Sequence, residues 1–213
     1  MGPSDELDGL ISRHGALAPC REAIWSAFGL ISGCYASGGK LLVCGNGGSA
    51  ADGEHIVGEL MKGFKLGRGV AGGVAGRLAE LYGDEGRRIA GTLQGALPAI
   101  SLVGQVALNT AFANDVSPEM AFAQAVYGLG REGDVILAIS TSGNARNVLC
   151  ALRTARAVGM RTVGLTGAAG GGMAGLCDAA IKAPETETYK VQELHLPIYH
   201  ALCAMLELEF FGG

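Results

Sequence analysis

The sequence predicts an α/β fold, a three-layer sandwich in which helices cover both faces of a five-stranded parallel sheet. Five short apolar runs alternate with longer stretches of helical periodicity, and this order builds a parallel sheet through right-handed crossovers. Two of the runs end directly in glycine- or hydroxyl-rich turns that lead into helices. Hydrophobic residues make up 49% of the chain and charged residues 17%, which excludes intrinsic disorder. With 213 residues, the chain is expected to form one domain, 1–213.

Each predicted strand is a short apolar run bounded by glycine or polar residues. The five runs lie at 41–44, 98–104, 134–140, 161–167 and 178–183. Apolar residues at helical spacing predict the helices. These lie at 5–38 (two helices, or one helix kinked at Pro19), 49–62, 105–113, 118–129, 144–158 and 187–211. Ligands are expected at the carboxyl ends of the strands, where the strand order reverses.

One stretch, 63–96, departs from this alternation. It is rich in glycine and alanine and carries four arginines, Arg68, Arg77, Arg87 and Arg88. We expect a loop here, with one helix near 76–82. A loop of this length within a domain usually has a function.

The charge balance and the cysteines restrict the function classes. Sixteen basic and twenty acidic residues give a net charge of −4, which does not indicate a nucleic-acid-binding surface. No run of 18 apolar residues predicts a membrane span, and the acidic N-terminus is unlike a secretory signal. The six cysteines are far apart and form no CxxC pair, so they indicate reduced thiols and a cytoplasmic location rather than a cysteine zinc site.

Two strand-to-helix turns are candidates for phosphate binding. CGNGGS (44–49) has glycines that let a ligand approach the backbone at a helix start, although its spacing matches neither G-x-G-x-x-G nor a P-loop. STSGN (140–144) adds three adjacent hydroxyls that can donate to a phosphate. The alternatives are an ordinary tight turn at the first site, with Ser49 as the helix N-cap, and an N-cap role for Ser142 or Asn144 at the second.

Two helices carry candidate acid–base or metal-binding residues. His55 and Glu59 are four residues apart and so lie on one helix face. Gln192 and His200 are eight apart, about 80° of helical rotation, whereas His195 points roughly 140° away from His200. Pro197 is expected to bend this helix. Each site has a non-functional alternative when it is considered alone. His55 and Glu59 could be a solvated surface pair, and each histidine of the second helix could be a capped or core histidine.

Together these blocks resemble the sugar isomerase (SIS) domain and, more closely, the phosphoheptose isomerase family. The resemblance rests on CGNGGSAADGEHIVGEL, FANDV, REGDVILAISTSGN, LTGAAGGGMAGLCD and VQELHLPIYH, and it spans about residues 20–210 apart from an insertion at about 65–95. It implies a flavodoxin-like fold, a homotetramer with sites between subunits, and conversion of sedoheptulose 7-phosphate to glycero-manno-heptose 7-phosphate.

The resemblance also implies roles for particular residues. It implies zinc bound by His55, Glu59, Gln192 and His200, with Glu59 as the base and His200 as the acid of an enediol mechanism. A tightly bound zinc ligand cannot be a free base at the same moment, so one ligand must loosen during turnover, or the ion is partly structural or inhibitory. The substrate-binding residues that it implies are Asn46, Gly47, Gly48, Ser49, Asn114, Asp115, Ser140, Thr141, Ser142 and Gln192.

This chain departs from the family pattern at three places. Ala145 replaces a frequent serine, and Arg146 is a hypothetical substitute contact to the phosphate. Lys62-Gly63-Phe64 replaces the usual Gly-Arg-Phe after the His/Glu helix. The insertion could form a lid, alter substrate choice or widen an interface, and its arginines could meet phosphate or be solvated.

Two other functions remain open at this stage. One is a non-catalytic SIS module that binds a sugar phosphate or a protein partner. Those that resemble the initiator-binding type lose the Glu and the final His that this chain keeps. The other is an isomerase of a different ketose phosphate.

Overall fold

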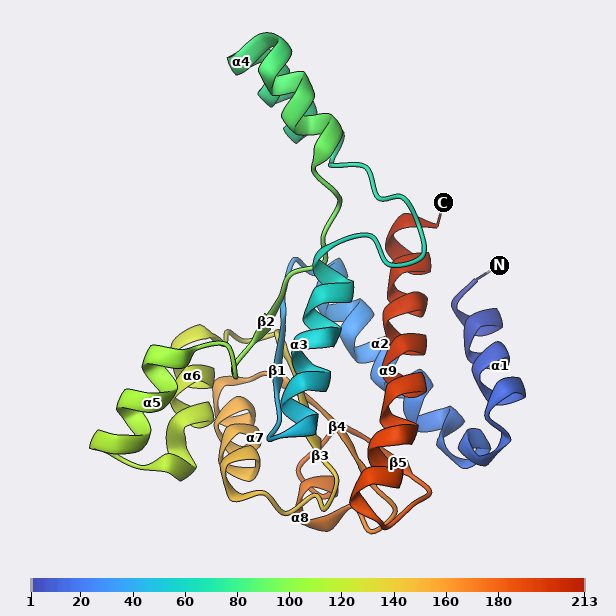
Figure 1. The fold of residues 1–213 in the computed structure, drawn as a ribbon, viewed down its shortest axis with the longest axis vertical. Helices are drawn as coiled ribbons and strands as arrows, with labels where there is room; N and C mark the ends of the chain where they lie inside the picture. Colours follow the sequence, from blue (N-terminus) through green and yellow to red (C-terminus); the bar gives the residue numbers. More distant parts are fainter. Residues whose placement is uncertain (1, 213) are drawn as a thin grey trace.

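A computed structural model of the chain describes residues 2–212 and shows one five-stranded, all-parallel sheet. The strand order is β2-β1-β3-β4-β5 (Figure 1). The strands are β1 (Leu41–Cys44), β2 (Ala99–Ser101), β3 (Val135–Ser140), β4 (Arg161–Gly167) and β5 (Ala179–Ala183). The predicted strands are therefore confirmed, and β2 is shorter than expected.

Helices cover both faces of the sheet, which confirms the predicted three-layer fold. On one face lie α1 (Pro3–Arg13), α2 (Arg21–Ala36), α3 (Gly48–Met61) and α9 (Thr188–Phe211). On the other lie α6 (Ala121–Leu129), α7 (Arg146–Val158) and the short α8 (Gly171–Ala174), which falls within a stretch expected to be a loop. α5 (Val106–Asp115) packs outside this second layer and has no fully buried residue. The chain also has two 3-10 turns, η1 (Gly15–Cys20) and η2 (Pro118–Met120).

Alternate side chains of each strand enter the two hydrophobic layers. In β1, Leu41 and Val43 pack against the α2–α9 layer, whereas Leu42 and Cys44 pack against the α6–α7 layer. All four are buried, which explains why the strand is a continuous apolar run rather than an alternating one. Among the described residues, no helix combines the length and the apolar character that a bilayer crossing requires.

The two helices that carry the candidate catalytic residues lie side by side. α3 begins directly after β1, and α9 packs along it (Figure 1). Both helices start near the carboxyl ends of the strands and run toward the other end of the molecule. α9 passes through Pro197 as one continuous helix, so its polar residues keep a helical spacing along this seam.

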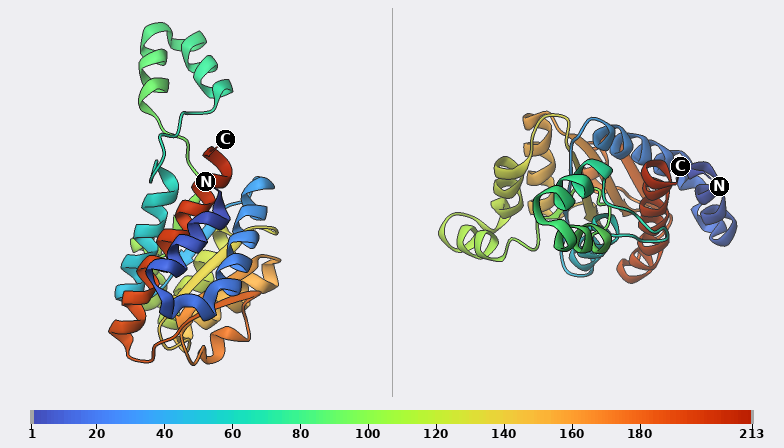
Figure 2. Two further views of the ribbon diagram at one scale, coloured as in Figure 1. Left: turned by 90° about the vertical axis from the view of Figure 1, so that its right-hand side faces the viewer. Right: turned by 90° about the horizontal axis from the view of Figure 1, so that it is seen from above.

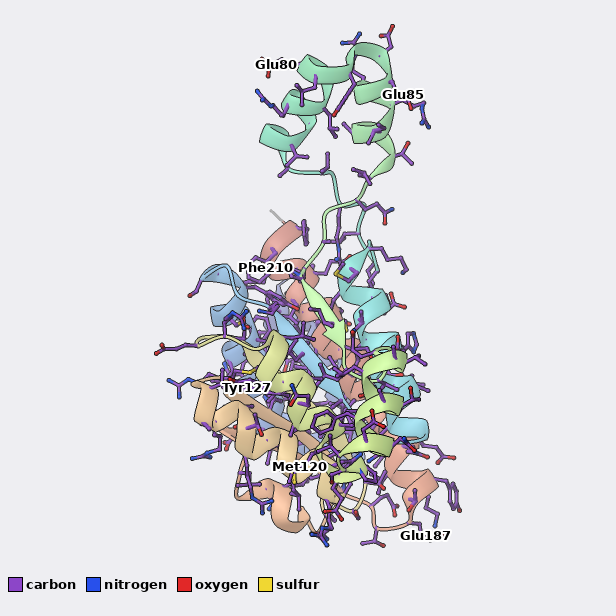
Figure 3. The ribbon with its side chains drawn as sticks, turned by 90° about the vertical axis from the view of Figure 1, so that its left-hand side faces the viewer. Glu80, Glu85, Met120, Tyr127, Glu187 and Phe210 are labelled. Atoms are coloured by element: carbon purple, nitrogen blue, oxygen red, sulfur yellow. The ribbon has the colours of Figure 1, made fainter. Side chains whose placement is uncertain are left out.

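The prediction of a loop at 63–96 is wrong for most of that stretch. Residues Gly72–Thr92 form α4, two helical arms that meet at Gly83 (φ 55°, ψ −126°). Figure 2 shows this hairpin projecting away from the sheet, and Glu80 and Glu85 lie near its far end (Figure 3). α4 makes no extensive contact with another described helix or strand. Its many glycines suppressed the helical pattern, because glycine has low helix propensity.

Candidate active site

A pocket of about 360 Å³ opens at the carboxyl ends of β1 and β3. The sheet order reverses between these two strands, which is where open α/β sheets bind ligands. Asn46, Gly47, Gly48, Ser49, Ile139, Ser140, Thr141, Ser142, Ala145, Thr188 and Gln192 line it. Both predicted phosphate-binding turns therefore meet in one cavity.

The glycines of the first turn have distinct structural roles. Gly47 adopts a positive φ (56°) as the N-cap of α3, a conformation that favours glycine. A Cβ on Gly48 would lie 2.3 Å from Nε2 of Gln192, so glycine here lets this side chain of α9 lie directly against the loop. Ser49 is buried in the first turn of α3 and is not the N-cap, which corrects that alternative.

The hydroxyl-rich turn is held by its own polar groups rather than by a helix cap. Ser142 Oγ accepts a hydrogen bond from the backbone N–H of Asn144 (3.2 Å), and Asn144 Oδ1 accepts one from Gly172 N–H (2.9 Å). α7 starts at Arg146 with Ala145 as its N-cap, so neither Ser142 nor Asn144 caps it. Ser140 and Thr141 lie in the pocket lining with Ser142.

Asn147 joins the two turns, and sequence reasoning missed it. Its carboxamide and that of Asn46 exchange two hydrogen bonds, each 2.9 Å long. Asn147 Oδ1 also accepts from the backbone N–H of Val148. No single-sequence pattern could pair side chains 101 residues apart. An asparagine in the first turn of the helix after STSGN is the only clue that the sequence offers.

His55, Glu59 and His200 come together on the α3–α9 seam. Nε2 of His55 lies 3.2 Å from Oε1 of Glu59, and the rings of His55 and His200 are 5.0 Å apart between centroids. Lys62 Nζ lies 3.0 Å from the other oxygen of Glu59. A basic side chain therefore contacts this carboxylate despite the departure from Gly-Arg-Phe.

His200 lies in a largely apolar setting. Its ring packs against Phe64 (5.5 Å) and Tyr199 (5.0 Å), and its Nε2 is buried with no hydrogen-bond partner among residues 2–212. Burial lowers the pKa of His200, and His55 lowers it further, while Glu59 opposes both effects. A neutral imidazole with one free nitrogen can exchange a proton with a hydroxyl or accept a cation.

Gln192 lies apart from the other three predicted zinc ligands within this chain. It contacts Gly48, and the eight residues that separate it from His200 correspond to about 12 Å of helical rise. Imidazole and carboxylate donors suit zinc, and the unpartnered Nε2 of His200 is free to coordinate it, so the donor set fits the ion. Among the described residues, no three His, Cys, Asp or Glu side chains are already arranged around a metal position.

Asn114 and Asp115 do not line the pocket. Their side chains bond each other (2.8 Å) at the exposed C-terminal end of α5. Arg146, the hypothetical phosphate contact, instead pairs with Glu119 (3.0 Å). Within one chain, these three side chains are not part of the cavity.

The arginines of the insertion also lie away from the pocket. Arg77, Arg87 and Arg88 pair with acidic residues three positions away on the exposed hairpin. Arg68 is buried and pairs with Glu207 (2.7 Å). α3 starts at the pocket and the hairpin follows its other end, so the hairpin is not a lid over the pocket of its own chain.

Comparisons with known proteins agree with this geometry. The SIS domain family matches residues 99–208. A phosphoheptose isomerase of Rhodospirillum rubrum is 38% identical over 191 residues, which cover 90% of this chain and 88% of that protein. The structure of a phosphoheptose isomerase from Francisella tularensis superposes with a TM-score of 0.71 at 30% identity, covering 96% of this chain and 93% of the other. That of Neisseria gonorrhoeae gives 0.70 at 29%, covering 96% and 91%. The chain therefore belongs to the phosphoheptose isomerase family of SIS-domain proteins.

Proposed function

We propose that this chain is an aldose–ketose isomerase that interconverts sedoheptulose 7-phosphate and D-glycero-D-manno-heptose 7-phosphate. Its family membership supports the reaction class. One observation carries the assignment of the chemistry: the carboxylate of Glu59 and the imidazole of His200 lie together at the α3–α9 seam, linked by His55.

The proposed mechanism moves two protons. Glu59 removes a proton from C1 of the ketose, which gives an enediol, and returns a proton to C2. His200 moves the hydroxyl proton from O1 to O2, so the carbonyl passes from C2 to C1. Ser140, Thr141 and Ser142 hold the phosphate together with the backbone N–H groups at the start of α3.

Zinc is proposed as the cofactor, held by His55, Glu59 and His200 of one chain and by Gln192 of another, since Gln192 lies apart from the other three within one chain. When bound, the ion would polarise the carbonyl oxygen as a Lewis acid and stabilise the charge that develops on it. His200 and Glu59 then have two roles. A residue cannot bind the ion tightly and carry a proton at the same moment, so one of the two would leave the ion during turnover.

We further propose that the working enzyme is a homotetramer whose sites combine two chains. Gly48 in the phosphate pocket and Glu59 are eleven residues apart on α3, about 16 Å of helical rise. An extended seven-carbon sugar phosphate spans only about 10 Å from C1 to phosphorus, because its eight bonds each advance about 1.25 Å. One chain's carboxylate therefore fits a substrate whose phosphate is held by another chain.

An exposed apolar face supports this assembly. The side chains of Val106, Val116, Met120 and Tyr127, from α5, η2, α6 and the turn after α5, are each more than 40% exposed. Figure 3 shows Met120 and Tyr127 on the side that α5 and α6 form. Large apolar side chains exposed on one side of a molecule often mark a protein interface. Asn114 and Asp115 lie beside it, where assembly would bring them to a neighbouring site.

A cytoplasmic location is also proposed. All six cysteines are free, as expected for a reducing compartment.

The reaction is tested by incubating the purified protein with sedoheptulose 7-phosphate in D2O, before and after chelation of metal and with zinc restored. NMR should show the C1 signals of the aldose and deuterium at its C2, the mark of an enediol. Turnover of pentulose or hexulose phosphates in place of the heptulose would change the assigned substrate. Binding of sugar phosphates without any turnover would indicate a non-catalytic module.

The shared site is tested by mixing two inactive variants. Glu59→Gln removes the base, and Ser142→Asp places a carboxylate where the phosphate binds. After dissociation and reassembly at equal amounts, about a quarter of the sites should have two intact halves and regain activity. A mixture of Glu59→Gln with His200→Gln is the control, because both changes fall in the same half-site. Failure of the first mixture would place the site within one chain.

A further inference from the structure

Tyr199 connects the two helices of the seam through its hydroxyl. Only 1% of the residue is exposed. The hydroxyl donates to Oδ1 of Asp52 (3.3 Å) and lies 3.1 Å from Nδ1 of His55. Nε2 of the same imidazole faces Glu59 at 3.2 Å. The result is one row of polar contacts that runs from Asp52 through Tyr199 and His55 to the proposed base.

The direction of these hydrogen bonds follows from the donors available. An ionised carboxylate only accepts, so the Tyr199 hydroxyl gives its proton to Asp52. Its oxygen can then accept from His55, which requires the proton of a neutral imidazole to be on Nδ1. Nε2 faces the carboxylate of Glu59, which also only accepts, so this contact requires a second proton on His55 or a cation shared by the two groups.

A purely structural role for this hydroxyl is the alternative. The Tyr199 ring packs edge-on against His55 (5.6 Å) and His200 (5.0 Å), and phenylalanine would fill the same space. Two observations favour a positioning role. The hydroxyl contacts His55 and Asp52 at once, and the second oxygen of Asp52 is buried without a partner among the described residues. An unpaired buried carboxyl oxygen destabilises the fold, and a functional role for Asp52 explains why it is present at this position.

We infer that Tyr199, anchored by Asp52, is a positioning residue that fixes the ring orientation of His55 and the proton on its Nδ1, and thereby the position of its Nε2 beside Glu59. The inference deepens the proposed function and rests on it for its effect on turnover. Its effect on His55 can be measured without any turnover. Neither Tyr199 nor Asp52 is among the residues that line the pocket.

Tyr199→Phe is the decisive variant, because it removes the hydroxyl and keeps the ring. Tyr35 offers a matched control: it is a buried tyrosine on α2 whose hydroxyl has no partner among residues 2–212. Two-bond proton–nitrogen NMR spectra of metal-free protein report which ring nitrogen of each histidine carries the proton. The signals of His55 are assigned by their loss in His55→Gln.

The wild-type protein and Tyr35→Phe should show His55 protonated on Nδ1. Tyr199→Phe should shift the proton of His55 toward Nε2. Its kcat should fall about tenfold or more with KM within about twofold, while Tyr35→Phe keeps the wild-type kcat. Zinc affinity of Tyr199→Phe, measured by competition with a chelating dye, should fall by about tenfold or more.

Three results would overturn the inference: a wild-type His55 that carries no proton on Nδ1, an unchanged His55 in Tyr199→Phe, or an equal loss of kcat in Tyr35→Phe. If Tyr199→Phe does not fold, Asp52→Asn removes the anchoring charge and is judged by the same His55 spectrum. If the wild type turns over no ketose phosphate, the proposed function fails, and the His55 spectra still decide the positioning role.

Discussion

The α3–α9 seam and the α4 hairpin are both helix pairs, but they use polar side chains in opposite ways. In the seam, the polar contacts of Tyr199 join residues about 145 positions apart, and several buried polar atoms have no partner among residues 2–212. In the hairpin, each ion pair joins residues three positions apart, and most of each side chain is exposed. Buried polar groups without partners cost folding free energy, so their presence indicates a functional site. Local, exposed ion pairs contribute little to stability and give no such indication.

The base assignment gives the largest expected difference between the two regions. Glu59→Gln removes the carboxylate and should lower kcat by about 10²–10⁴-fold, the usual contribution of a general base. Folding and assembly should be unaffected. The matched variant Glu80→Gln changes an exposed carboxylate of the hairpin and should keep the wild-type kcat. Steady-state kinetics with both variants provides the test, and an active Glu59→Gln enzyme would refute the assignment.

Arg68 marks the boundary between the two regions and predicts the largest loss of stability. Its guanidinium pairs with Glu207 and also donates to the backbone oxygens of Glu59 and Leu60. Burial alone would raise the pKa of Glu207, but hydrogen bonds from Phe64 and Lys65 N–H and from Arg68 hold it below its usual value.

Arg68→Met would leave the Glu207 carboxylate buried without its cation. The free energy of unfolding should fall by about 3–5 kcal/mol. Unfolding in guanidinium chloride, at one fixed protein concentration, measures the change in the free energy of unfolding. Arg77→Met, which breaks an exposed pair in the hairpin, should leave the midpoint at its wild-type value. Equal midpoints for the two variants would show that the buried pair does not anchor the insertion.

His195 predicts a pH dependence of stability that belongs to the seam. It is fully buried on α9, and neither ring nitrogen has a hydrogen-bond partner in the described part of the chain. Burial lowers the pKa of His195 to about 4, and the Thr166 backbone lies near enough to oppose the shift slightly without bonding geometry. The unfolded chain has the ordinary pKa of about 6.5 and binds the proton more readily.

The contribution of neutral His195 to the free energy of unfolding is therefore complete above about pH 6.5, and it is lost as the pH falls toward 4. The loss should reach about 3 kcal/mol. Unfolding midpoints at pH 7, 5.5 and 4.5 are compared with those of His195→Leu, which should depend less on pH in this window. A parallel dependence in the variant would assign the acid sensitivity to other groups.

The sequence predicted the sheet and most of the seam, because these rest on local patterns. A buried parallel strand is a run of apolar residues, and two residues four apart on a helix, such as His55 and Glu59, lie on the same face. The contact between Gln192 and Gly48 and the pair of Asn46 and Asn147 depend on how distant segments pack, which one sequence does not encode in a readable form. In the proposed assembly, the position of Asn114 and Asp115 relative to a complete site depends on a second chain.

Asn147 predicts a smaller effect on substrate binding. Asn147→Ala removes both hydrogen bonds to Asn46, each worth about 0.5–1.5 kcal/mol, and frees the glycine turn from the hydroxyl turn. KM should rise by about five- to tenfold, with kcat within twofold, because the proposed site puts the reacting carbons at Glu59 and the phosphate beside this pair. An unchanged KM would mean that the two turns hold their positions without it.

The hairpin predicts the smallest effect on turnover, and Gly86 is the place to test it. A Cβ on Gly86 would lie 1.8 Å from the backbone oxygen of Leu78, so the two arms of α4 can pack closely only with glycine there. Gly86→Ala must therefore separate the arms and change the shape of the hairpin. If the hairpin is independent of the catalytic seam, kcat and KM stay at their wild-type values although trypsin cleaves faster after Arg87 and Arg88. If kcat falls instead, the hairpin reaches a site on another chain, and the contrast between the two regions does not hold in the assembled enzyme.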